Sequence, residues 1–125
     1  MTNTNLYIKT SQPSLYKNRT TYADYEVTIF AESVVPVDKK TSAIDLKVAC
    51  KMVRDSITVP FSVIPSDNLC TIPIRFSISP VFINKPDYAV IRLYVDNSCG
   101  TTYNIDYGTP IGKITFSEKF NIIIS

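Results

Sequence analysis

The chain has 125 residues, of which 45% are hydrophobic and 19% charged, and its formal net charge is +2. This length is typical of a single domain, here residues 1–125, which can bury one hydrophobic core. The nearly balanced charge excludes a broad positive surface, so we expect no nucleic-acid partner.

The N-terminal part of the chain is polar over residues 1–12 and lacks the basic start and apolar run of a signal peptide. No segment is apolar over the length that spans a membrane. We therefore expect an intracellular protein that has no membrane partner.

Alternating apolar and polar residues, the pattern of half-buried strands, recur along the chain, whereas a helical period is absent. Prolines such as Pro60 place these strands at edges, starts or bends, since proline has no N–H to donate. At Gly108 the sequence indicates a tight turn, which would use the positive φ that glycine tolerates. The strand patterns cover residues 6–8, 25–30, 44–48, 57–63 and 72–78, and three segments between 88 and 116. They predict an all-β fold, a compact barrel or sandwich of about eight short, mostly antiparallel strands.

The chain ends in a run of β-branched and aromatic residues at 120–125. An uncovered strand of this kind promotes edge-to-edge aggregation, so another strand or surface should cover it. The terminal strand could be covered in two ways: it could pair with the chain's own sheet, or it could dock on a neighbouring subunit. The candidate subunit interface consists of apolar residues from this run and from the strand predicted at 72–78: Phe120, Ile122, Ile123, Ile124, Ile74 and Phe76.

The three cysteines, Cys50, Cys70 and Cys99, are odd in number and widely spaced. They cannot form a complete set of disulfides, and they lack the paired spacing of a zinc site. We therefore expect reduced thiols in the core, and neither a metal nor another cofactor. The chain also has no histidine, which excludes Ser–His and Cys–His catalysis.

Several short patterns line up with the trimeric dUTPase family over much of the chain. Residues 23–27 resemble the family's opening Ala-x-Tyr-acid-aliphatic element, and residues 44–49 resemble the strand that follows an aliphatic-proline turn. The family's closing pattern is similar to Asn97, Tyr103, Ile105, Gly108 and the strand at 111–114. The resemblance implies a β-clip fold and a homotrimer.

In the family, one hairpin reads uracil and carries the catalytic Asp, and residues 82–88 resemble it. By this resemblance, Asn84, Asp87 and Tyr88 occupy vestigial nucleotide-site positions. Tyr88 matches the tyrosine that stacks under the deoxyribose. Asn84, however, stands where the carboxylate would fall, and an amide cannot accept a proton from water. Asp87 takes the place of that carboxylate only if the alignment with the family's hairpin is shifted along the chain.

Other catalytic parts of the family are missing from this sequence. The chain has no Pro-Arg-Ser-Gly phosphate-binding element, no glycines after Tyr88 and no glycine-rich C-terminal arm. We therefore expect a protein that is not an enzyme. In size, all-β pattern and lack of catalytic motifs it resembles the small telokin-like proteins of baculoviruses. This likeness implies a viral protein in the cytoplasm or nucleus of infected cells.

The predicted function is that of a non-catalytic viral structural or interaction protein which acts through self-association; the sequence names no other protein partner. Two alternatives remain open. One is a divergent nucleotide pyrophosphatase of the dUTPase type, which would use Asp87 and Tyr88 at a subunit junction and Arg54 or Arg75 on the phosphates. The other is a virion protein of the jelly-roll class.

Overall fold

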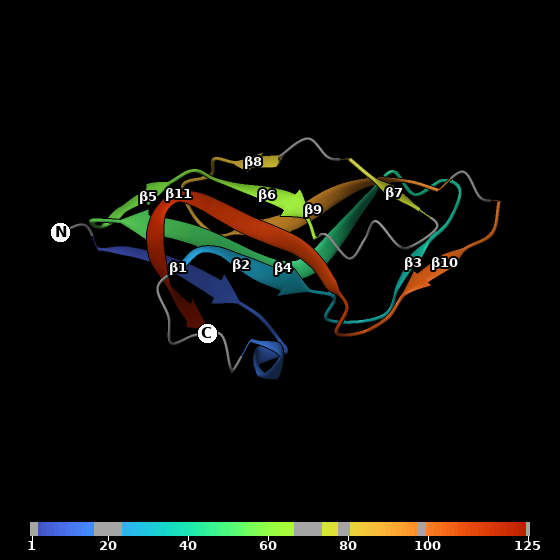
Figure 1. Cartoon of the computed structure of the whole chain (residues 1–125), viewed down its shortest axis with the longest axis horizontal. Helices are drawn as coiled ribbons and strands as arrows, with labels where there is room; N and C mark the ends of the chain where they lie inside the picture. Colours follow the sequence, from blue (N-terminus) through green and yellow to red (C-terminus); the bar gives the residue numbers. More distant parts are fainter. Residues whose placement is uncertain (1–2, 17–23, 67–73, 78–80, 98–99, 125) are drawn as a thin grey trace.

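The computed structural model describes residues 3–16, 24–66, 74–77, 81–97 and 100–124, which are mostly β-strand (Figure 1). The elements are, in chain order, β1 (Thr4–Lys9), the 3-10 helix η1 (Pro13–Leu15), β2 (Asp24–Phe30), β3 (Val35–Val37), β4 (Ala43–Arg54), β5 (Ile57–Val59), β6 (Phe61–Pro65), β7 (Arg75–Phe76), β8 (Val81–Ile83), β9 (Ala89–Asp96), β10 (Tyr103–Ile105) and β11 (Pro110–Ile124). The all-β prediction is confirmed. The described residues form eleven strands rather than about eight, and β4 and β11 are long, at 12 and 15 residues.

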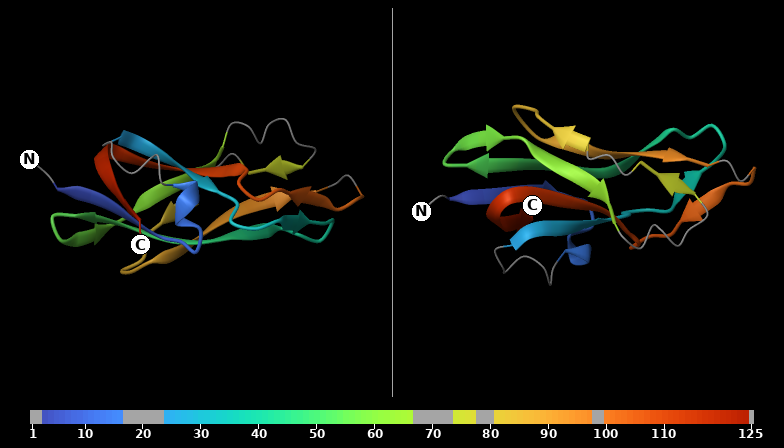
Figure 2. Two further views of the ribbon diagram at one scale, coloured as in Figure 1. Left: turned by 90° about the horizontal axis from the view of Figure 1, so that it is seen from below. Right: turned by 45° about the horizontal axis from the view of Figure 1, so that its top comes forward.

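Nine of the described strands form one curled, mixed sheet in the order β7-β9-β4-β1-β11-β6-β8, with β2 added to β11 and β5 added to β4. Figure 2 shows that the curl makes two layers. The front layer holds β2, β6 and the first part of β11, and the back layer holds β1, β4, β9 and the end of β11, while β8 continues the sheet beyond β6 along one edge. Strands β3 and β10 form a separate pair at one end.

Strand pairing is mostly antiparallel, as the sequence predicts. The exception among the described strands is β1, which runs parallel to the end of β11. This pair joins the two extremes of the described chain. Because the paired segments are so far apart in sequence, no local pattern of residues predicts this pairing.

Strand β11 belongs to both layers because it changes partners along its length. Residues 110–115 pair with β2 and, in part, with β6, whereas residues 121–124 pair with residues 5–8 of β1. Between the two parts the β2 pairing shifts register after Thr115 and resumes at Phe120. The chain's own sheet therefore covers the terminal run, which is the first of the two covers that the sequence left open.

The core lies between the layers, where alternate residues of each strand point inward. Leu6 and Met52 are fully buried in the back layer, and Val63 and Ile114 are fully buried in the front layer. Each layer thus shields the inner face of the other. The outer faces of both remain for contacts with other molecules.

Two residues that the sequence singles out set the local geometry. Pro60 divides the strand predicted at 57–63 into β5 and β6, since it cannot donate to a ladder. Gly108 has a φ of +81°, and its N–H donates to the carbonyl of Ala31 at 2.8 Å. The N–H of Ala31 in turn donates to the carbonyl of Thr109 at 2.9 Å. The predicted positive-φ turn at Gly108 is confirmed.

Some predicted features lie wholly or partly outside the described residues. They include Ala23, Cys70 and Cys99, together with much of the strand predicted at 72–78. In the described part of that segment, Arg75–Phe76 form β7, which pairs with Asp96 and Val95 of β9.

Candidate functional site

The predicted nucleotide-site residues lie in the connection between β8 and β9. Asn84 and Asp87 are exposed, and Tyr88 is half-buried. One oxygen of Asp87, Oδ1, accepts a hydrogen bond from the N–H of Tyr88 at 2.8 Å and lies 3.7 Å from Nζ of Lys51. The Asp87 side chain is 77% exposed, so this ion pair is weak. Within the described part of the chain, no hydrogen bond joins Asn84 to either residue.

Two lysine ammonium groups lie against the ring of Tyr88. Nζ of Lys51 is 4.6 Å from the ring centroid, and Nζ of Lys9 is 5.0 Å from it. Lys51 also lies 5.7 Å from the ring centroid of Tyr7. At these distances the negative faces of the rings attract the cations. We call Tyr7, Lys9, Lys51 and Tyr88 together the tyrosine–lysine surface.

Strand register brings the tyrosine–lysine surface together. Tyr7 of β1 lies directly opposite Lys51 of β4. Cys50 pairs with Ala89 of β9, so the next antiparallel pair places Lys51 beside Tyr88. Lys9 follows Tyr7 by two residues and shares its face. The intervening residues of these strands point into the core, so the surface lies on the outer face of the back layer.

Directly beneath this surface, Cys50 points inward and is fully buried. Burial raises the pKa of its thiol well above the usual range, and the negative charge of Glu32 raises that pKa further. The thiolate form, which is the nucleophile, is therefore disfavoured at neutral pH. Cys50 is a free core thiol, as the sequence predicts.

Glu32 is itself a buried carboxylate that sequence reasoning missed, with 6% of its surface exposed. Its Oε1 accepts hydrogen bonds from the N–H and the hydroxyl of Ser11, both at 3.2 Å. Its Oε2 has no hydrogen-bond partner among the residues that the structure describes. Glu32 ties the segment after β1 to the end of β2.

The two candidate phosphate-binding arginines lie away from Tyr88 within one chain. Arg54 shares the face of inward-pointing Met52, and its guanidinium lies 3.3 Å from the carboxylate of Glu118. Arg75 pairs with Asp96, which is about 26 Å along β9 from Tyr88 at the usual strand rise. Neither of these two arginines therefore reaches the Asp87–Tyr88 pair within one chain, and the pyrophosphatase hypothesis depends on a second subunit to supply them.

The candidate interface residues are for the most part covered within the chain itself. The exposed fractions are 1% for Phe120, 7% for Ile122 and 3% for Ile74, whereas Ile123 is 38% exposed. Phe76 and Ile124 are partly buried and pack against the core. A subunit contact at these positions stays a prediction. The aggregation argument behind it no longer applies to the buried side chains, because β1 already pairs with the terminal run.

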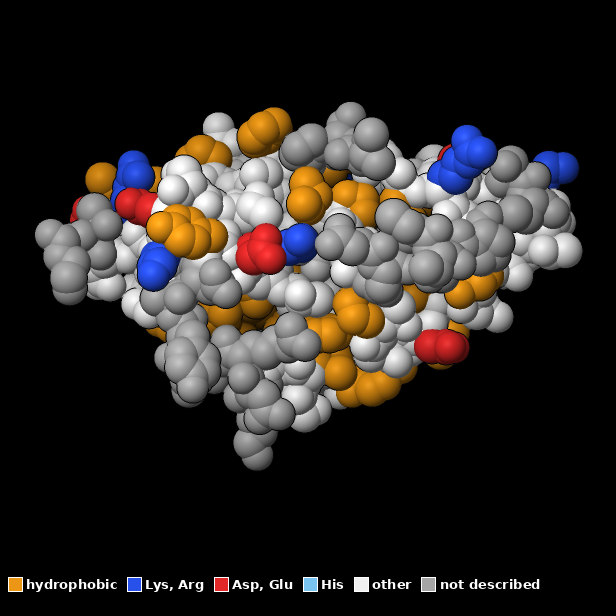
Figure 3. Space-filling view, in the orientation of Figure 1, with side chains coloured by type: hydrophobic (Ala, Val, Ile, Leu, Met, Phe, Trp, Pro, Cys, Tyr) orange, Lys and Arg blue, Asp and Glu red, His pale blue; other side chains and the backbone are white. Residues whose placement is uncertain are grey.

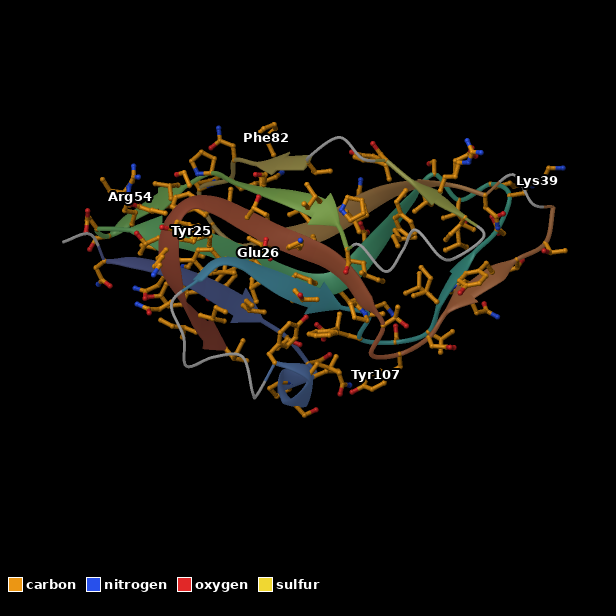
Figure 4. The ribbon with its side chains drawn as sticks, in the orientation of Figure 1. Tyr25, Glu26, Lys39, Arg54, Phe82 and Tyr107 are labelled. Atoms are coloured by element: carbon orange, nitrogen blue, oxygen red, sulfur yellow. The ribbon has the colours of Figure 1, made fainter. Side chains whose placement is uncertain are left out.

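The most exposed large apolar side chain in the described part of the chain is Phe82, at 75%. It lies on β8, which ends the sheet order and pairs with β6. Figure 4 shows Phe82 projecting from this edge, on the opposite side of the molecule from Tyr107. Sequence reasoning did not identify this exposure, because a three-residue strand has too few positions to show which face points outward.

The front layer has little net charge around this edge. Across it, Glu26, Thr115, Ser62 and Phe82 form one cross-strand row on the outer face. The hydroxyls of Ser62 and Thr115 share a hydrogen bond of 3.2 Å, and Glu26 lies 3.6 Å from Nζ of Lys113. Figure 3 shows this acidic and basic pair side by side near the centre of the face, with apolar side chains above and below it.

Comparison with known proteins adds no relative to these observations: no protein-family model and no curated protein matches the chain. The resemblance to the dUTPase family therefore stays a prediction. The described residues contain no group of three or more His, Cys, Asp or Glu side chains arranged to hold a metal ion. None of their helices is long and apolar enough to cross a bilayer.

Proposed function

We propose that the chain is a non-catalytic structural or interaction protein that acts through self-association, on a scaffold that resembles the β-clip fold of the dUTPase family. The observation that supports it best is Phe82, whose side chain is 75% exposed on the edge strand β8. The partner that we propose for this edge is a second copy of the chain.

An edge strand presents main-chain N–H and C=O groups that can pair with another strand. Aromatic side chains are enriched at the centres of protein interfaces, where they supply most of the binding energy. Burying a side chain such as Phe82 contributes about 1.5–3 kcal/mol. The uncharged Ser62–Thr115 pair beside it can enter an interface without the desolvation of a charge.

The resemblance extends this proposal in two respects. A homotrimer is favoured, because the dUTPase family is trimeric. A viral origin, with the protein in the cytoplasm or nucleus of infected cells, follows from the likeness to telokin-like proteins. Both extensions depend on the resemblance and are separate from the argument about Phe82.

Light scattering on a sizing column tests self-association directly. We expect the unmodified chain to elute with three times the 14.0 kDa mass of one chain. Phe82→Asp should elute as a single chain, because it places a charge where the partner's apolar surface would lie. Tyr107→Asp is the matched control, since Tyr107 is 48% exposed but lies far from β8. A single-chain mass for the unmodified protein at micromolar concentration would refute the proposal.

The alternative of a nucleotide pyrophosphatase keeps one supporting observation, the presence of Lys9, Lys51 and Asp87 around Tyr88. Incubation with dUTP and Mg²⁺, followed by an assay for pyrophosphate, separates the two functions. We expect no turnover. Turnover that is abolished by Asp87→Asn would replace our proposal with the enzymatic one.

A further inference from the structure

The tyrosine–lysine surface lies on the back layer and takes no part in the self-association proposed at β8. On this exposed face of the sheet, the ammonium group of Lys51 lies between the rings of Tyr7 and Tyr88, which come from neighbouring parts of the sheet. We propose that this surface binds single-stranded nucleic acid. The inference does not depend on the proposed function.

The two lysines supply positive charge that one exposed carboxylate offsets only in part. Lys9 is exposed, and no described carboxylate lies at ion-pair distance from it. The partner of Lys51 is Asp87, which is 3.7 Å away and 77% exposed. Both ammonium groups lie within 5.0 Å of the same ring centroid, so they are close enough together for one polyanion to contact both.

The two tyrosines supply rings on which bases can stack. Tyr7 and Tyr88 are half-buried and flank Lys51 in one cross-strand row. Aromatic rings on a sheet face, interleaved with cations, are the arrangement by which several protein folds bind single strands without reading their sequence. Bases of a duplex are already stacked on each other, and this favours a single strand as the ligand.

The same outer face continues along β9, where every second residue from Val90 to Tyr94 is exposed and offers an apolar, cationic or aromatic side chain to a single strand. Val90 is 55% exposed and Tyr94 is 49% exposed. Between them, Arg92 extends over the face and forms a 2.7 Å contact with Asp45. A nucleic-acid strand that crosses the tyrosine–lysine surface along β9 would therefore meet a third ring at Tyr94.

A protein partner fits this surface less well. Lysine is depleted from the centres of protein interfaces, where desolvating its charge is unfavourable. Here Lys51 lies at the centre of the surface, between the two rings. The β8 edge has the opposite character, with a large exposed apolar side chain beside the uncharged Ser62–Thr115 pair.

Overall composition does not predict this site, because a net charge of +2 is small for a nucleic-acid-binding protein. The charge acts locally, since three strands bring Lys9, Lys51 and Tyr88 together from distant parts of the chain. The expectation of no nucleic-acid partner rests on the small net charge and on tyrosines that are scattered in the sequence, and neither feature shows which side chains the strands bring together.

Fluorescence anisotropy with a labelled oligothymidylate of about 12 nucleotides tests the proposal. We expect saturable binding at low salt that weakens as salt is added. The double variant Lys9→Ala/Lys51→Ala should bind at least tenfold more weakly, and its salt slope should fall by about one for each lysine removed. The matched control is Lys39→Ala/Lys40→Ala, which loses the same charge from an exposed turn at the far end (Figure 4).

A second pair of variants tests the stacking. Tyr88→Ala should weaken binding and Tyr88→Phe should retain it, because stacking needs the ring and not the hydroxyl. Phe82→Asp should bind the oligonucleotide like the unmodified chain, which separates this proposal from self-association.

Three outcomes would overturn the proposal. They are an absence of binding at low salt, an equal loss in the Lys39→Ala/Lys40→Ala control, and competition by thymidine monophosphate that matches the oligonucleotide at equal nucleotide concentration. The last would indicate a mononucleotide site instead. Circular dichroism of each variant checks that the strands are intact.

Discussion

The two outer faces of the curled sheet differ in the side chains that the alternating strands point toward solvent. On the front layer, the charges of Lys113 and Glu26 offset each other, and the row ends at the exposed ring of Phe82. On the back layer, Lys51 lies between the rings of Tyr7 and Tyr88. The difference suggests that one chain carries two surfaces, an apolar edge for a protein and a cationic aromatic face for a polyanion.

The largest effect should come from a pair of neighbours that point to opposite sides of β1. Leu6→Ala should lower the free energy of unfolding by about 2–5 kcal/mol, since Leu6 is fully buried between the layers. Tyr7→Ala should lower it by about 1 kcal/mol or less, because only cross-strand contacts on the outer face are lost. Urea unfolding of both variants gives the two values. Equal losses would show that the outer face is part of the core, which would remove the contrast between the faces.

A second pair tests how closely the layers approach. At Gly108, φ is +81°, so Gly108→Ala should destabilise the protein by about 1–2 kcal/mol. At Gly112 a new Cβ would lie 3.5 Å from Val63 of the neighbouring strand β6 and 3.8 Å from Leu46 of the back layer, and both are ordinary contacts. Gly112→Ala should therefore stabilise by about 0.4–1 kcal/mol.

Thermal unfolding followed by circular dichroism measures both glycine variants. If Gly112→Ala proves as damaging as Gly108→Ala, the layers pack more tightly at β11 than the structure indicates.

The smallest effect should come from the exposed ion pair on the back layer. The side chains of Arg92 and Asp45 are 54% and 52% exposed, so their 2.7 Å contact is screened by water. Asp45→Asn should leave the urea midpoint unchanged within error. It should also tighten oligonucleotide binding slightly at low salt, since it removes a negative charge from that face. Weaker binding would place the ligand elsewhere.

The sequence predicted local features of the fold well. Alternation identified the inner face of β4, Pro60 marked a strand boundary, and Gly108 marked a positive-φ turn. It missed the bend in β11 and the parallel pairing with β1, because pairing between the two extremes of the described chain leaves no local pattern. The number of strands was underestimated, since very short strands such as β7 have no periodicity to detect.

The candidate site was predictable only in part. The sequence placed Asp87 and Tyr88 together, as neighbours in the chain must be. It did not find Lys9 or Lys51, because alternation fixes the face on which a residue lies and not the register between strands. The apolar character of Phe120 and Ile122 is compatible with an interface and with a core strand, and within one chain both side chains are buried.

Sedimentation of three proteins tests most directly whether the two outer faces have separate roles and whether self-association resides at the β8 edge. At micromolar concentration, we expect the unmodified chain and Lys9→Ala/Lys51→Ala to sediment as the same oligomer, and Phe82→Asp to sediment as a single 14.0 kDa chain. A single-chain mass for the unmodified protein, or an unchanged oligomer in Phe82→Asp, would contradict the account.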